Sequence, residues 1–171
     1  MQCGTDLANL VDRAKELLSK LEYINVATVS PAGLPWNTPV YARHDALLNF
    51  YWSSWKNAQH SLNLKTNENV FFTLYDSTRM RGDNNRRCLY FQGHAAEVEA
   101  TSEIELVLPL LYPEEPAEQD AGKFVGDSLR RLYKARPIAV WLNDKSERQV
   151  TRETLKMRIE VPLDALVAPA C

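Results

Sequence analysis

The stretch from Tyr51 to Val98 decides the fold of this chain. It reads YWSSWKNAQHSLNL at residues 51–64, VFFTLY at residues 70–75 and CLYFQGHAAEV at residues 88–98. Aromatic and β-branched residues dominate the parts that we expect to be strands. The polar segment between the first two runs, about 57–66, is expected to form a short helix that carries His60. The stretch therefore predicts a strand, a short helix and two further strands.

The rest of the chain extends this pattern in both directions. Apolar residues at helical spacing predict an amphipathic helix over residues 6–21. Further strands are expected at 24–30, 36–43, 47–52, 137–142 and 155–161. Two helices are expected from Thr101 onward, the second over roughly residues 119–134, so that 101–134 is a helical excursion from the sheet.

The order of these elements favours an antiparallel sheet. Short connections between successive strands suit antiparallel pairing, because a parallel crossover needs about a dozen residues or more. Such a sheet buries itself best by closing into a barrel. Gly93 lies in the middle of a strand, where glycine often marks a bulge or a close approach of another segment. We predict one mainly β domain over 1–171, an antiparallel barrel with flanking helices.

Composition and charge exclude several classes of function. The net charge of −2 gives no overall field that favours nucleic acid. No apolar run is long enough to span a bilayer. The three cysteines are odd in number and widely spaced, which favours reduced thiols and a cytoplasmic protein. No glycine-rich nucleotide motif or nucleophile elbow occurs, and no histidine has metal-ligand spacing, so we predict no metal site.

Two hydroxyls and an imidazole lie near the start of the short helix. Ser53 and Ser54 end the preceding strand, and His60 follows in the helix. Unpaired N–H groups and the positive end of the helix dipole favour an anion there, above all a phosphate. Ordinary capping by serine and asparagine side chains is the alternative interpretation. We expect His60 to be partly exposed at this helix start.

Four motifs in this order resemble the FMN-binding split-barrel superfamily that includes pyridoxamine 5′-phosphate oxidase. They are Ala27–Pro35 around a glycine turn, Asn37–Val40, the step from Trp52 to Leu64, and Phe91–Ala95. The resemblance covers roughly residues 7–100 and, with a weaker match, 136–161. It implies the split β-barrel fold of the FMN-binding type.

The resemblance also implies a set of cofactor-binding residues. Thr38, Pro39 and Val40 would contact the isoalloxazine ring. Ser53, Ser54 and His60 would contact the ribityl chain and phosphate, with Trp52 and Gln92 in the matching strands. Trp141, Arg148 and Arg152 resemble a tryptophan and two arginines that reach flavin or substrate across a dimer interface. A core aromatic and two solvated arginines are the alternative for these last three.

The function implied is that of a cytoplasmic, homodimeric flavoprotein, an FMN-dependent oxidoreductase of a small molecule. No side chain stands out as a catalytic acid or base, because the flavin would carry the chemistry. A deazaflavin-dependent reductase is one alternative, for which the arginines of residues 79–87 would supply basic groups. A non-catalytic carrier or regulator that binds flavin or haem is another. Exposed aromatic surface favours the homodimer; its expected contributors are Trp36, Trp52, Trp55, Phe71 and Tyr75.

Overall fold

One antiparallel sheet organises the molecule. The computed structural model describes residues 3–78, 87–143 and 158–167. The strands are β1 (Tyr23–Val29), β2 (Pro35–Tyr41), β3 (Arg43–His44), β4 (Phe50–Trp55), β5 (Asn69–Tyr75), β6 (Cys88–Glu97), β7 (Arg130–Asn143) and β8 (Arg158–Glu160). They are arranged in the order β2-β1-β5-β6-β7-β4-β3, and β8 pairs with β7.

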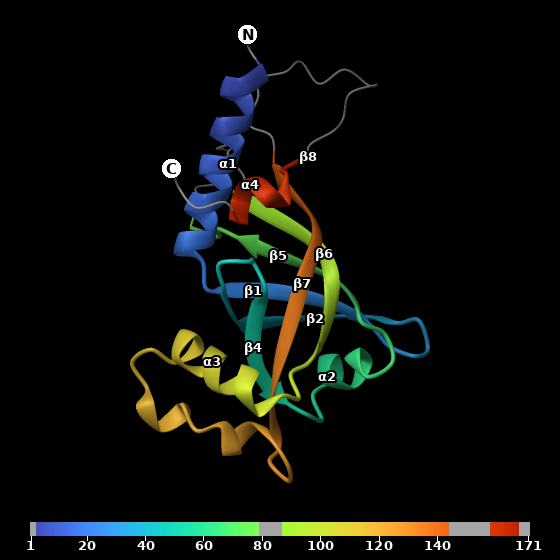
Figure 1. The fold of residues 1–171 in the computed structure, drawn as a ribbon. Coiled ribbons are helices and arrows are strands. Elements are labelled where there is room, and N and C mark those ends of the chain that lie inside the picture. Colours follow the sequence, from blue (N-terminus) through green and yellow to red (C-terminus); the bar gives the residue numbers. More distant parts are fainter. Residues whose placement is uncertain (1–2, 79–86, 144–157, 168–171) are drawn as a thin grey trace.

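The sheet curls until its two ends approach each other. The outermost strands of the order, β2 and β3, are joined by the single residue Ala42, so the chain itself holds the two ends together. Contacts between β2 and β4 cross the remaining gap. Figure 1 shows the strongly curved strands that result. The predicted antiparallel barrel with flanking helices is confirmed.

Helices lie at both ends of this barrel. They are α1 (Cys3–Lys20), α2 (Gln59–Leu64), α3 (Thr101–Leu111) and α4 (Leu163–Val167), with 3₁₀ turns η1 (Pro116–Glu118) and η2 (Ala121–Phe124) after α3. In Figure 1, α1 and α4 lie together at one end, whereas α2 and α3 lie toward the other. Among the described helices, none is both long and apolar enough to cross a bilayer.

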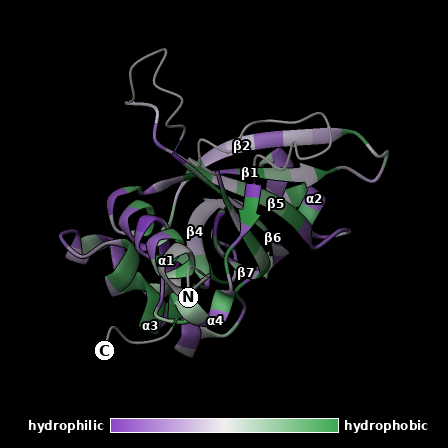
Figure 2. Cartoon of the chain, turned by 90° about the horizontal axis from the view of Figure 1, so that it is seen from above, coloured by the Kyte–Doolittle hydropathy of each residue, from purple (hydrophilic) through white to green (hydrophobic). Residues whose placement is uncertain are grey.

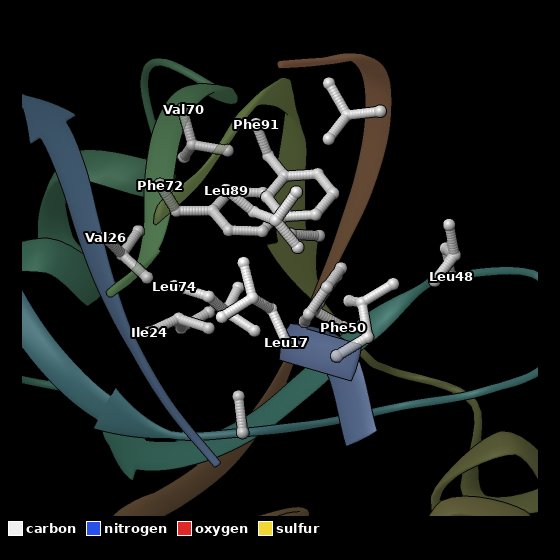
Figure 3. Close-up of a cluster of buried hydrophobic side chains, with 14 of the residues drawn as sticks. Leu17, Ile24, Val26, Leu48, Phe50, Val70, Phe72, Leu74, Leu89 and Phe91 are labelled. Atoms are coloured by element: carbon white, nitrogen blue, oxygen red, sulfur yellow. The ribbon is translucent and has the colours of Figure 1, made fainter. Parts of the chain in front are cut away.

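One apolar cluster lies inside the barrel, and a second lies on the outside of the sheet. Inside, Phe50, Phe72 and Phe91 pack with ring centroids 4.9–5.1 Å apart, as seen in Figure 3. Outside, Tyr51 of β4 and Leu132 of β7 join the buried face of α3. In Figure 2 the α3 segment is largely hydrophobic in colour, whereas β2 is pale to purple. Alternate residues of β4 and β7 therefore serve two different clusters.

The predicted helix over 119–134 is wrong. Residues 121–124 form only the 3₁₀ turn η2, and β7 begins at Arg130. Phe124 and Leu132 are buried, but Leu129 between them is 54% exposed. Pairing with both β4 and β6 holds the segment after Arg130 as a strand. Tertiary hydrogen bonding has here overridden a local helical spacing. The helical excursion accordingly ends at Phe124.

Gly93 marks a bulge, as its position in the strand suggested. The register between β6 and β7 shifts between Gln92 and Gly93, which leaves Ile138 as an extra residue on β7. A Cβ atom on Gly93 would lie 2.3 Å from the carbonyl oxygen of Arg136. Only glycine lets the two strands approach so closely.

Candidate functional site

The step from β4 to α2 separates the residues predicted to bind phosphate. Because side chains alternate along a strand, Ser53 and Ser54 point to opposite faces of β4. Ser53 faces α3, and its hydroxyl lies 2.6 Å from the phenol oxygen of Tyr112. Arg130 donates to the Ser53 oxygen at 3.3 Å. Ser53 therefore belongs to a contact with the helical excursion.

Arg130 is the centre of that contact. Its guanidinium donates to the Tyr112 phenol at 2.8 Å and pairs with Glu118. It also lies 4.9 Å from the ring centroid of Phe124. The hydrogen bonds from Arg130 and then Lys123 lower the pKa of the Glu118 carboxyl. This network ties η1, η2 and α3 to the end of β4.

Ser54 differs from Ser53 in its hydrogen bonding. Its side chain is half-buried, and its hydroxyl makes no hydrogen bond to another described residue. Its cross-strand partner Arg131 is occupied by Glu97, at 2.8 Å. Lys56, in the turn before α2, makes no ion pair with another described residue. Sequence reasoning missed Lys56, although a lysine four residues before His60 was a usable signal.

His60 is buried, which corrects the expectation of a partly exposed helix start. Only 4% of it is exposed, and its Nε2 atom has no hydrogen-bond partner in the described part of the chain. Burial lowers the pKa of the imidazole. The capping interpretation also fails, because the N-cap of α2 is Ala58, with no side-chain cap. Trp52 is fully buried and stacks on Tyr133 at 5.7 Å.

The three residues predicted from β2 have different surroundings. Val40 is 8% exposed and belongs to the barrel core. Thr38 accepts a hydrogen bond of 2.8 Å from the indole of Trp36. Pro39, between them, is exposed and points to the opposite face of β2. Thr38 and Pro39 are thus open to a ligand, and Val40 supports them from inside.

Gln92 and Trp141 share the outer face of the sheet. Pairing of β6 with β7 sets Tyr90 opposite Trp141 and Gln92 opposite Ala139. Phe71 of β5 lies beside them, with its ring 6.5 Å from Trp141 and 6.3 Å from Tyr90. Gln92 is exposed, and the three rings are half-buried. We call Phe71, Tyr90 and Trp141 the aromatic strip.

A surface pocket of about 290 Å³ continues this face beyond Gln92. It is lined by Glu68, His94, Ala95, Ala96, Glu97, Val98, Glu99, Glu103, Lys134 and Arg136. His94 pairs across the strands with Arg136, and its Nδ1 atom is 3.7 Å from Glu68. Lys134 is held by Glu103 at 2.7 Å. Two-residue spacing from Gln92 could have placed His94 here, whereas Arg136 needed the register of β7.

The predicted site residues therefore form separate groups within one chain. Trp52 and His60 are buried, and Gln92 and Trp141 lie on the outer face. Ser54 and Thr38 are half-buried, and we call these two, together with Lys56, the rim residues. Arg148 and Arg152 lie outside the described residues, as do Arg79, Arg81 and Arg86. Arg87, also expected to line a ligand site, bonds Glu16 at 2.7 Å. In the described ranges, no three His, Cys, Asp or Glu side chains are grouped to hold a metal ion.

Solved structures with the same fold are numerous, although no protein-family model and no curated protein sequence matches the chain. The haem storage protein HutZ from Vibrio cholerae is 21% identical with a TM-score of 0.65, over 78% of this chain and 94% of that one. A haem-binding protein from Mycobacterium smegmatis is 13% identical with a TM-score of 0.69, over 92% and 60%.

A third structure carries the name of an oxidase. It is named as a candidate pyridoxamine 5′-phosphate oxidase from Listeria innocua, and is 17% identical with a TM-score of 0.57, over 78% of this chain and 97% of that one. At these identities the similarity concerns the fold. The chain has the split-barrel fold that these haem-related and oxidase-like proteins share.

Proposed function

We propose that the protein binds FMN and acts as an oxidoreductase on a small molecule. The observation that carries the proposal is the aromatic strip with the exposed amide of Gln92 beside it. A flat conjugated ring packs well against half-buried aromatic side chains. A side-chain amide both donates and accepts hydrogen bonds, which suits the polar edge of an isoalloxazine. When bound, FMN would supply electron or hydride transfer.

The residues available at the rim fit the rest of the cofactor. Ser54 and Thr38 offer hydroxyls for the ribityl chain and phosphate, and Lys56 offers a cation without an ion-pair partner in the described part of the chain. Ser53 is committed to Tyr112 and Arg130. His60 is enclosed and stays neutral, because burial lowers its pKa. We therefore assign the phosphate contact to the rim and not to His60.

A homodimer follows from the separation of the two groups. The rim residues and the aromatic strip belong to different faces of the same sheet, so one flavin reaches both only if two copies contribute. Half-buried Phe71 and Trp141, together with exposed Tyr75 on the same face, supply apolar surface for that contact. The cofactor would lie between the copies.

Titration of FMN and riboflavin into cofactor-free protein tests the proposal. We expect FMN to bind more tightly, and Lys56→Gln to remove most of the difference, about three- to fivefold for one exposed charge contact of up to about 1 kcal/mol. Gln92→Ala should weaken both ligands equally, since the amide would face the ring they share. Lys65→Gln, an exposed lysine at the end of α2, is the control. If FMN does not bind, the proposal is contradicted.

Haem is the second candidate, and His94 is the observation that favours it. Its side chain is 40% exposed, two residues after Gln92 on β6 and opposite Arg136. Neutral imidazole is a common axial ligand of haem iron, and a guanidinium could pair with a propionate. A haem-specific site predicts an intense haem absorption band that His94→Ala abolishes. FMN binding, by contrast, should survive that substitution.

A further inference from the structure

Four buried polar atoms without partners belong to residues that cluster around Tyr133, next to α2. They are Trp52 Nε1, His60 Nε2, Ser61 Oγ and Tyr133 OH, and none has a hydrogen-bond partner in the described part of the chain. Each of the four residues is at most 4% exposed. Buried polar groups in folded proteins are nearly always hydrogen-bonded, so four exceptions in one place need an explanation.

The other three residues lie around Tyr133. Trp52 stacks on its ring at 5.7 Å, and the ring of His60 meets it edge-on at 6.4 Å. Ser61 follows His60 in α2 and is close enough to oppose the rise that burial causes in the pKa of the Tyr133 phenol. No well-formed hydrogen bond joins that serine to the phenol. The four residues are thus neighbours, and none of the four atoms has a hydrogen-bond partner among them.

We infer that the barrel end behind α2 encloses an internal hydration site, in which ordered water bridges Trp52, His60, Ser61 and Tyr133. An indole N–H can only donate, whereas the hydroxyls and the imidazole can donate or accept. Water matches that mixture, because one molecule typically makes about three hydrogen bonds. One or two molecules would satisfy all four atoms.

Charge decides between water and an ion. An enclosed anion would need a compensating positive charge, because burying a lone charge is very costly. His60 cannot supply it, since burial favours its neutral form. Arg131, whose charge acts on the Tyr133 phenol, already pairs with Glu97. This environment therefore favours a neutral molecule over an ion.

Removal of single hydroxyls tests the inference. If the Tyr133 phenol bonds internal water, Tyr133→Phe loses a hydrogen bond and lowers the melting temperature by about 2–4 °C. If the phenol makes no hydrogen bond, the same substitution removes an unpaired buried polar group and does not lower the stability. An unchanged or higher melting temperature would therefore overturn the inference. Thr28→Val is the matched control. Its buried hydroxyl accepts a hydrogen bond from Asn63 at 2.9 Å, so this substitution should lower the melting temperature.

A double variant tests whether the site is shared. The loss of stability in the double variant Ser61→Ala/Tyr133→Phe should be smaller than the sum of the two single losses. The reason is that the second substitution removes a water bridge that the first has already weakened. Strict additivity would count against a common water. A high-resolution crystal structure gives the direct result. Density within hydrogen-bonding distance of at least two of the four atoms supports the site, whereas direct bonds among the side chains would refute it.

Discussion

At Gly93 the backbone of β6 passes so close to β7 that a side chain has no room. The nearest atom to an added Cβ is the Arg136 carbonyl oxygen, which is backbone and cannot rotate away. The same residue sits at the register shift and between Gln92 and His94. One glycine therefore sets how the aromatic strip continues into the pocket.

Gly93→Ala should destabilise the fold, because the strands must separate to admit the methyl group. Overpacking of this kind costs about 1–3 kcal/mol or more. Gly33→Ala is the control: Gly33 has a φ of +78° but nothing within 4 Å, so only the left-handed strain of about 1–2 kcal/mol applies. Urea unfolding of both variants measures the difference. A Gly93→Ala variant as stable as the natural protein would mean that β6 and β7 tolerate the added atom.

His60 should make stability fall in mild acid. Burial holds its folded-state pKa below the ordinary value of 6.5. Below that value the unfolded chain binds a proton that the folded chain refuses, so unfolding is favoured as the pH falls. Thermal unfolding from about pH 7.5 to about pH 5.5 should show a smaller drop for His60→Gln than for the natural protein. Identical profiles would indicate an imidazole that titrates freely.

The segment after α3 shows how an element depends on its neighbours. Its apolar spacing suits a helix, yet residues 130–135 pair with β4 and the strand pairs with β6 from Tyr133 onward. A strand in the centre of a sheet gains two ladders of hydrogen bonds, which local propensity cannot match. What remains of the excursion is attached through Arg130.

Arg130→Gln should loosen the excursion without unfolding the barrel. The change removes hydrogen bonds to Tyr112 and Ser53 and the pair with Glu118, at a net cost of about 1 kcal/mol for a partly exposed group. Limited proteolysis should cut residues 112–129 faster. Arg43→Gln, which breaks the pair with Glu22 elsewhere on the barrel, should leave cutting there unchanged. Unchanged cleavage in Arg130→Gln would assign the attachment to apolar packing alone.

The whole molecule carries much of its aromatic surface on the outside. Of the residues expected to supply that surface, Trp36, Trp55 and Tyr75 are 48–60% exposed and Phe71 is half-buried. Trp52 is the exception, because it lies inside the barrel. Exposed apolar patches usually mark an interface.

Phe71→Glu should separate the proposed dimer. Light scattering of the natural protein at micromolar concentration should give about twice the chain mass of 19.5 kDa. A charge in the aromatic strip would be buried without a partner at the interface, which favours single chains. Leu106→Glu, at an 80% exposed position on α3, should not change the mass. A monomeric natural protein would contradict the two-copy site.

Alternation and spacing by themselves indicated most of the strands, the first helix and the irregularity at Gly93, because these features rest on residues near one another in the chain. The split-barrel fold was expected from the resemblance of four motifs in order. Only the tertiary structure decided which face each residue serves. In the structure His60 is buried, Ser53 accepts a hydrogen bond from Arg130, and residues 130–136 belong to a strand. Strand register and sheet closure join residues far apart in sequence, and no local pattern encodes which partners they will meet.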